Sequence, residues 1–301
     1  MEMCWSANSA CVNGLNMHWE ACGPERGDPV LLLMGLGGQL IHWPDDLACE
    51  LVDRGFRVIR FDNRDAGLSA DADKGVTVNI ARDWLRSRFG QRAASNYTLH
   101  DMADDSIGLL DTLGLKKAHF VGVSMGGMIA QIAAGRHAPR VRSLTSIMSS
   151  TNHHKLPPAR LDVLWRMAGI GPRPKTREEV IQCSTRMLRR VGSPGYPTPI
   201  ERRRQLVGRA YDRAFRPAGH MRQAHAIIST GSFEDLLPQI KAPTQVVHGL
   251  ADPLLRPECG RRSAQLIRNA KLELIPGMGH DFAPGLMPRW AELISANAAR
   301  A

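Results

Sequence analysis

Residues 118–127 read Ala-His-Phe-Val-Gly-Val-Ser-Met-Gly-Gly, a short apolar run that ends in the pattern Gly-x-Ser-x-Gly around Ser124. The run has the length of a strand, and the residues that follow it have helical spacing. A serine on a strand-to-helix turn needs small neighbours because the backbone there is strained. The pattern also arises by chance, but its position between a predicted strand and a predicted helix favours Ser124 as a nucleophile.

Short β-rich segments alternate with helical segments on both sides of this turn. Such alternation is typical of an α/β fold, in which βαβ units form a mostly parallel sheet flanked by helices. The predicted strands are Asn16–Cys22, Pro29–Met34, Phe56–Phe61, Ala118–Val123, Val141–Met148, Thr244–His248 and Lys271–Ile275. The predicted helices of this part are Pro44–Arg54, Thr98–Leu113, Met125–Arg136, Pro257–Ile267 and Met287–Ala298.

The alternation stops at Ser149 and resumes near residue 236. The segment between these points contains no convincing strand, only helical stretches separated by Pro- and Gly-rich turns. These stretches are Ala159–Met167, Glu178–Val191, Ile200–Phe215 and Met221–Ser229. We therefore predict an α/β core formed by residues 1–150 and 236–301, with an inserted helical cap over residues 151–235.

A shorter insert, Ala70–Tyr97, follows the strand that ends at Phe61. Within it Ile80, Trp84 and Phe89 can line one face of a helix, with arginines largely off that face. This pattern fits an interfacial helix and also a short helix packed on the cap, and we favour packing.

The composition is that of a folded globular protein. The chain has 301 residues, of which 43% are hydrophobic and 23% charged. These values and the absence of a long apolar run exclude an intrinsically disordered, a fibrous or an integral membrane protein.

The net charge of +10 is concentrated in the predicted cap, where 16 basic residues face 7 acidic ones. Such a patch can attract anionic substrates or anionic lipid, or it can be a solvated helical face. No nucleic-acid motif accompanies it, so we expect no nucleic acid as a partner.

The six cysteines are scattered without a Cys-x-x-Cys pair, which indicates free thiols in a reducing compartment. The first residues lack a basic segment followed by an apolar one, so we expect no signal peptide. We predict a cytoplasmic protein, with peripheral membrane association through the basic cap as a further hypothesis.

A reactive serine needs a base and an acid that orients the base. Asp252 follows the predicted strand Thr244–His248, and His280 follows the predicted strand Lys271–Ile275. Both side chains then lie on loops at the carboxyl ends of later strands, in the order Ser, Asp, His. We predict Ser124, Asp252 and His280 as the catalytic residues. His248 can support the site, but we favour its interpretation as a core histidine, and we interpret Asp281 as a poor orienter because consecutive side chains diverge.

Acyl transfer to serine also needs donors for the oxyanion. The backbone N–H of Met125 is one candidate, and Leu36 N–H in the glycine-rich loop after Pro29–Met34 is the other. His42 is a candidate substrate contact. We expect no cofactor and no metal ion, because His153-His154 lacks carboxylates and metal-ligand spacing.

These motifs together resemble the α/β-hydrolase superfamily over nearly the whole chain. Met34–Gly37 is similar to the His-Gly-x-Gly oxyanion loop, with Met in place of His. Asp62–Ser69 is similar to the Asp-x-Arg-Gly-x-Gly-x-Ser turn, with Asp65-Ala66 in place of Gly-x. Gly249–Asp252 and Gly277–His280 complete the set.

Within the superfamily, Met34–Gly38, Trp43–Asp45 and Arg57–Ser69 resemble the aclacinomycin methylesterase-like group. In length and Arg-rich composition the chain also resembles mycobacterial lipases/esterases of the LipG type. The resemblance implies a serine esterase acting on a small-molecule acyl ester or lipid, with phospholipids and thioesters as further substrates.

Three alternatives stay open from the sequence, of which a non-enzymatic basic adaptor that binds nucleic acid or membrane is the last. A cofactor-free haloperoxidase-like perhydrolase uses the same three residues, and a non-catalytic hydrolase fold can bind a small ligand while it retains them.

Overall fold

An eight-stranded sheet lies at the centre of the protein, as a computed structural model shows for residues 4–73, 75–77, 79–87, 89–91, 93–163 and 174–301. The strand order is β1-β2-β4-β3-β5-β6-β7-β8. β1 and β2 form an antiparallel hairpin, β2 pairs antiparallel with β4, and the other pairs are parallel. The strands are β1 Ser6–Val12, β2 Leu15–Cys22, β3 Asp28–Leu33, β4 Phe56–Phe61, β5 Ala118–Val123, β6 Val141–Ile147, β7 Thr244–Gly249 and β8 Lys271–Ile275.

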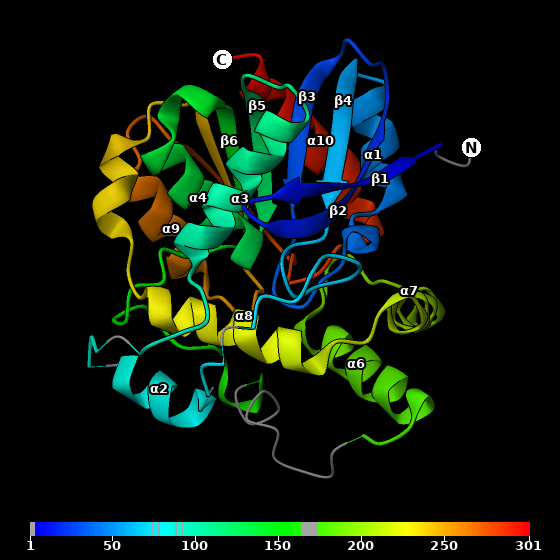
Figure 1. Ribbon diagram of the computed structural model, residues 1–301, viewed down its shortest axis with the longest axis vertical. Coiled ribbons are helices and arrows are strands. Elements are labelled where there is room, and N and C mark those ends of the chain that lie inside the picture. Colours follow the sequence, from blue (N-terminus) through cyan, green and yellow to red (C-terminus); the bar gives the residue numbers. More distant parts are fainter. Residues whose placement is uncertain (1–3, 74, 78, 88, 92, 164–173) are drawn as a thin grey trace.

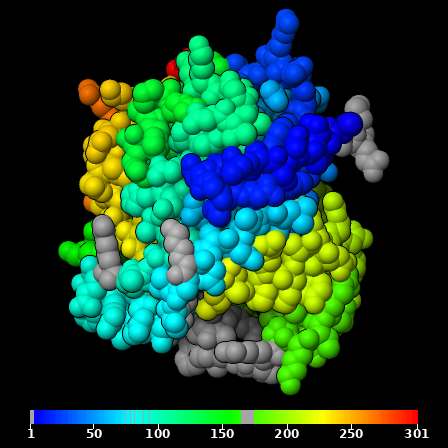
Figure 2. All heavy atoms as spheres, in the orientation of Figure 1, coloured from blue at the N-terminus to red at the C-terminus, as the bar shows by residue number. Residues whose placement is uncertain are grey.

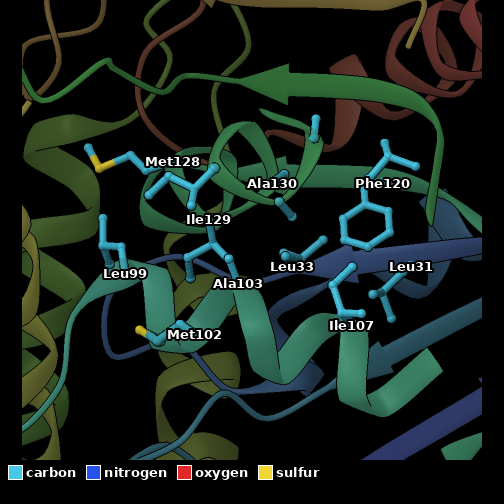
Figure 3. Packing of buried hydrophobic residues seen from close by; sticks show 14 of the residues in the cluster. Leu31, Leu33, Leu99, Met102, Ala103, Ile107, Phe120, Met128, Ile129 and Ala130 are labelled. Carbon is cyan, nitrogen blue, oxygen red and sulfur yellow. The ribbon is translucent and has the colours of Figure 1, made fainter. Parts of the chain in front are cut away.

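Helices cover both faces of the sheet, and alternate residues of the central strands point to each side. Leu31 and Leu33 of β3 pack in one apolar cluster with α3 and α4, whereas Val30 and Leu32 pack in a second cluster with α1 and α10. Figure 3 shows Leu31 and Leu33 pointing towards the side chains of α3 and α4. The helices of this part are α1 Asp45–Val52, α3 Leu99–Thr112, α4 Met125–Arg136, α9 Pro257–Leu266 and α10 Met287–Ala298. The prediction of a mostly parallel α/β sheet flanked by helices is therefore confirmed.

The hairpin strand β1 was not predicted from the sequence. Six of its seven residues lie partly or fully exposed, so hydrophobic alternation gives no signal there. Its pairing with β2 depends on the turn at Asn13-Gly14, where both residues have positive φ (50° and 80°). Asn-Gly favours this turn geometry, so it is the local signal that marks the hairpin.

Between β6 and β7 the described residues form helices and no strand. They are α6 Arg177–Val191, α7 Ile200–Arg213, α8 Pro217–Thr230 and the 3-10 helix η3 Glu234–Gln239. We call residues 151–235 the cap. In Figure 1 its helices gather at one end of the molecule, on the opposite side from the C-terminus. Residues 164–167 of the predicted helix Ala159–Met167 lie outside the described residues.

The cap helix α8 begins at Pro217, four residues before the predicted start at Met221. Proline is favoured in the first turn of a helix because its missing N–H is not needed there. The helix lies on the loops that follow β3 and β4, since Gln223 contacts Gly37 and Arg222 contacts Asp65. The cap therefore covers the carboxyl edge of the sheet.

The second insert carries α2 Ile80–Ser87, which packs on α8. Packing on the cap was expected, but not through the predicted apolar face. Asp83 is the buried residue at the contact, while Trp84 is 43% and Phe89 77% exposed. No helix in the described part of the chain is long and apolar enough to cross a membrane.

His119 of β5 gives the fold a testable pH dependence. Its side chain is buried and its Nδ1 lies 2.8 Å from Ser143 Oγ. Burial, with a smaller contribution from Arg142, lowers its pKa to about 4. An unfolded histidine takes up a proton near pH 6.5, so acidification between about 6.5 and 4 favours the unfolded chain by up to about 3 kcal/mol.

We expect His119→Gln to reduce this loss of stability. Chemical denaturation at neutral pH and near pH 4 measures it: the free energy of unfolding of the wild type should fall more steeply than that of the variant. The slope should not vanish, because burial also lowers the pKa of His42, His220 and His248. Equal slopes for both proteins would contradict the assignment.

Candidate active site

Ser124 occupies a strained turn between β5 and α4. Its φ of 54° and ψ of −122° are unusual for a residue with a side chain. The turn closes only because its neighbours are glycines. A Cβ on Gly126 would lie 2.0 Å from the carbonyl oxygen of Leu33, and a Cβ on Gly122 would lie 2.2 Å from that of Gly126. The sequence pattern around the serine is therefore a steric requirement of this turn.

The structure brings Ser124, His280 and Asp252 together. His280 Nε2 lies 3.0 Å from Ser124 Oγ, and His280 Nδ1 lies 2.6 Å from Asp252 Oδ2. Because a carboxylate oxygen only accepts, Nδ1 carries the hydrogen of the second contact. Nε2 is then free to accept a hydrogen bond from the serine hydroxyl. This is the geometry in which an imidazole removes a proton from a serine.

The carboxylate of Asp252 is buried and held from its other side. Its Oδ1 accepts hydrogen bonds from the backbone N–H groups of Leu254 and Leu255, at 2.8 and 2.9 Å. His248 donates from Nε2 to the carbonyl oxygen of Leu255 and lies 3.6 Å from Asp252 Oδ2. Burial lowers the pKa of His248, which favours its neutral form. His248 is buried, as expected of a core histidine, and it also supports the Asp252 loop.

The loop after β3 passes directly beside the serine. A Cβ on Gly35 would lie 3.2 Å from Ser124 Cβ. No described residue accepts a hydrogen bond from the backbone N–H of Leu36. Met125 is the first residue of α4, and helix geometry leaves its N–H without an intrahelical partner. The two predicted oxyanion donors thus lie on the two segments that meet at Ser124.

This loop is held by Gln223, which the sequence did not single out, and by Asn63 of the Asp62–Ser69 turn. Gln223 of α8 accepts a hydrogen bond from Gly37 N–H at 2.8 Å and donates to the carbonyl oxygen of Arg64 at 2.7 Å. Asn63 donates to the carbonyl oxygen of Met34 at 3.0 Å. The loop is therefore tied both to the cap and to the turn after β4. Neither contact has a local sequence signal, since each joins segments far apart in the chain.

The turn at Asp62–Ser69 departs from the family pattern at Asp65. This residue has a φ of 66°, a conformation that favours glycine. Its carboxylate accepts hydrogen bonds from Arg222 at 2.6 Å and from the Tyr97 hydroxyl at 2.6 Å. Burial alone would raise the pKa of Asp65, but these hydrogen bonds outweigh it and lower the pKa. Where the family pattern has a glycine, this chain has Asp65, and the carboxylate of Asp65 makes an ionic contact with the cap.

The other candidates lie apart from the triad contacts. His42 is in the 3-10 helix η1 Leu40–His42, where its Nδ1 accepts a hydrogen bond from Gln39 N–H at 2.9 Å. Its role as a substrate contact stays a prediction. The rings of His153 and His154 stack at 4.5 Å. Among the described residues no group of three or more His, Cys, Asp or Glu side chains is arranged to hold a metal ion.

Asp281 does not orient His280 but ties its loop to the cap. Its Oδ1 accepts hydrogen bonds from the backbone N–H and the hydroxyl of Ser193, at 3.0 and 2.6 Å, and its Oδ2 pairs with Arg203. The Ser193 hydroxyl in turn accepts from Gly279 N–H at 2.8 Å. His280 N–H donates to the carbonyl oxygen of Val191 at 2.6 Å. The end of α6 therefore fixes the backbone on both sides of the histidine.

We expect Ser193→Ala to lower the free energy of unfolding by about 1–3 kcal/mol, because it leaves a buried N–H and a buried carboxylate each without one hydrogen bond. Ser87→Ala is the control, since the Ser87 hydroxyl bonds the carbonyl oxygen of Trp84 at the surface. Urea denaturation of both variants measures the difference. Equal, small effects would show that the Ser193 contacts contribute nothing to stability.

Comparison with known proteins places these features in context. A family model described as the alpha/beta hydrolase fold matches residues 28–283. The chain is 29% identical over 273 residues to a protein assigned as the carbamate hydrolase RutD of Variovorax paradoxus (strain S110), with 88% of this chain and 89% of the relative covered. It is 25% identical over 281 residues to rhodomycin D methylesterase DnrP of Streptomyces peucetius, with 87% of each covered.

Solved structures show the same fold. The meta-cleavage product hydrolase CumD of Pseudomonas fluorescens IP01 has a TM-score of 0.75 at 19% identity, with 97% of each chain covered. A bacterial membrane phospholipase A has a TM-score of 0.69 at 23% identity, with 98% of this chain and 85% of that chain covered.

Proposed function

The chain belongs to the α/β-hydrolase fold family, and from that premise we propose that it is a serine-dependent carboxylic ester hydrolase. The family match confirms the resemblance indicated by the motifs, and the methylesterase relatives agree with the group suggested within it. A fold does not determine a reaction, so the proposal depends on the site. The observation that carries it is the hydrogen-bonded chain from Ser124 Oγ through His280 to Asp252.

In the first half of the proposed reaction His280 Nε2 takes the proton of Ser124 Oγ as Oγ bonds to the acyl carbon. The carbonyl electron pair moves onto oxygen, and the N–H groups of Leu36 and Met125 bind the resulting oxyanion. His280 then gives its proton to the leaving alcohol as the carbon–oxygen bond breaks. Asp252 stabilises the imidazolium and fixes which ring nitrogen carries the hydrogen.

The second half repeats these steps with water. His280 accepts a proton from a water molecule while the water oxygen attacks the acyl-enzyme carbon. His280 then returns that proton to Ser124 Oγ when the carboxylic acid leaves. The site thus regenerates its starting state without a cofactor. Water is the only co-reactant that the cycle consumes.

A panel of p-nitrophenyl esters and thioesters of graded acyl length, with a methyl ester, a phospholipid and a carbamate, tests the proposal. The methylesterase and carbamate hydrolase relatives motivate the methyl ester and carbamate arms. We expect ester hydrolysis with one preferred acyl length and none in the Ser124→Ala variant. Absence of turnover on every substrate, or turnover that survives Ser124→Ala, would contradict the proposal.

Two alternative functions predict different results on the same protein. A perhydrolase forms peracid from acetate and hydrogen peroxide faster than it hydrolyses esters. A relative assigned as the non-heme bromoperoxidase BpoC of Mycobacterium tuberculosis is 31% identical, but over only 35% of this chain. A ligand-binding hydrolase fold gives no turnover in any arm.

Peripheral attraction to anionic membranes is a further part of the proposal. The cap carries 16 basic and 7 acidic residues. In the described part of the cap, however, most arginines lie in ion pairs, which reduces the charge they present to a partner. These paired arginines are Arg160, Arg177, Arg190, Arg202, Arg203, Arg204, Arg213, Arg216 and Arg222. The cap charge therefore supports long-range attraction more than a specific contact.

A further inference from the structure

The helix α2 turns its carboxylate inward and its large apolar side chains outward. Asp83 has a fully buried side chain, which lies 3.0 Å from His225 Nε2 of α8 and accepts hydrogen bonds from Arg82. The helix therefore packs on the cap through a polar contact. This is the reverse of the usual arrangement of a surface helix, whose apolar stripe faces the core.

Large apolar side chains are exposed on α2 and just after its end. Trp84, Leu85 and Phe89 are 43%, 56% and 77% exposed. Nine large hydrophobic side chains are exposed in the described part of the chain, and three of them lie between positions 84 and 89. Scattered exposed apolar residues are normal in soluble proteins, whereas a cluster marks a surface for interaction. We call Trp84, Leu85 and Phe89 the apolar cluster.

The segment that carries the cluster has an excess of basic residues, and the two carboxylates just before it, Asp71 and Asp73, are ion-paired with Arg222. Residues 74–97 contain five basic residues and one acidic residue, and that acid is Asp83. Since Asp83 faces α8, the charged side chains exposed on the described part of this segment are Arg82 and Arg86. Arg86 takes part in no ion pair among the described residues. Figure 1 shows α2 at the edge of the molecule, beside one end of α8 and away from the sheet. Figure 2, in the same orientation, shows α2 at the surface in the lower left of the molecule.

We propose that α2 and Phe89 form a docking surface for a lipid bilayer that carries anionic headgroups. Tryptophan and arginine are suited to the headgroup level, where an indole has one apolar and one polar side and a guanidinium can pair with phosphate. Leu85 and Phe89 enter the acyl boundary, and Arg86 is attracted by the negative surface potential, whereas the charge of Arg82 is offset by its ion pair with Asp83. A second copy of the chain is a poorer occupant, because two such surfaces would bring like charges together.

Co-sedimentation of the full chain with vesicles tests the proposal without any turnover. Vesicles of phosphatidylcholine alone are compared at low salt with vesicles that also contain phosphatidylglycerol. The test variant combines Trp84→Ser, Leu85→Ser and Phe89→Ser. The matched control combines Ile200→Ser and Phe215→Ser, because these side chains of the cap are 53% and 51% exposed and lie outside the cluster.

We expect the wild type and the control to bind anionic vesicles, and the cluster variant to bind them roughly tenfold or more weakly. Arg86→Glu should weaken binding more than Arg189→Glu, whose arginine lies on α6 of the cap. The tryptophan emission of the wild type should shift to shorter wavelength with anionic vesicles, and Trp84→Phe should remove that shift. Circular dichroism of each variant should be unchanged, because the altered side chains are exposed.

Three results would overturn the proposal. The first is no binding to anionic vesicles, and the second is equal loss in the cluster variant and the Ile200/Phe215 control. The third is a wild type that is a dimer by light scattering and a cluster variant that is a monomer. That result would assign the surface to a second copy of the chain. Ester hydrolysis measured in parallel on a water-soluble substrate should be the same in all variants, so failure of lipid docking is separable from failure of the proposed esterase activity.

Discussion

Replacing Ser124 by alanine is expected to lower kcat on an active ester by about 10⁵- to 10⁶-fold, with little change in stability. The hydroxyl oxygen is the atom proposed to form the acyl-enzyme, and its removal leaves His280 with no proton to accept. Steady-state kinetics on the best ester of the panel measures the loss. Thermal unfolding of the variant verifies that the strained turn still forms.

Ser149→Ala is the matched control for this prediction. The Ser149 hydroxyl, which follows β6, donates a hydrogen bond to the carbonyl oxygen of Ser124 at 2.8 Å, so the control removes a hydroxyl that contacts the same turn. We expect its kcat to stay within about tenfold of the wild type, since one neutral hydrogen bond contributes about 1 kcal/mol. A Ser124→Ala variant no slower than Ser149→Ala would refute the nucleophile.

Replacing Asp252 by asparagine is expected to lower kcat by about 10⁴-fold. Asparagine retains the size of the side chain but offers an N–H to His280 Nδ1. The ring then carries its hydrogen on Nε2, where it faces Ser124 Oγ and cannot accept the proton. The loss should appear in kcat and much less in KM, because Asp252 contacts His280 and not the proposed substrate position.

Asp281→Asn is the control that distinguishes orientation of the His280 ring from support of the His280 loop. Asp281 adjoins His280 in sequence and is also buried, but it contacts Ser193 and Arg203. Its replacement weakens the loop attachment without changing the tautomer of His280, so we expect a loss in kcat of roughly tenfold or less. Equal losses in Asp252→Asn and Asp281→Asn would mean that Asp252 has no special role towards the imidazole.

The main features of the site could be predicted because they depend on local signals. The glycines around Ser124 are imposed by contacts within a few residues of the turn, so they are visible as a motif. Asp252 and His280 follow predicted strands, and parallel strands place their carboxyl ends at one edge of a sheet. Chain order and loop position were therefore sufficient to identify three residues that the fold brings within hydrogen-bonding distance.

The contacts between cap and core could not be predicted in the same way. Gln223 meets Gly37, Arg222 meets Asp65, and Ser193 meets Asp281 across separations of 186, 157 and 88 residues. Such pairs depend on how the cap lies on the sheet, and single-sequence patterns carry no information about that placement. The same reason explains α2, where the packing partner His225 determines that Asp83 is buried. Helical spacing alone predicted that α2 would contact the cap through its apolar face.

Reaction with a fluorophosphonate, followed by mass spectrometry of the intact chain and of its peptides, tests the activated serine most directly. The reagent is attacked by a serine oxygen only where a neighbouring base removes the proton, so it reports activation independently of the natural substrate. We predict one adduct per chain, located on Ser124, with labelling strongly slowed in His280→Ala and absent in Ser124→Ala. An unlabelled wild type, or an adduct located on another residue, would contradict the account.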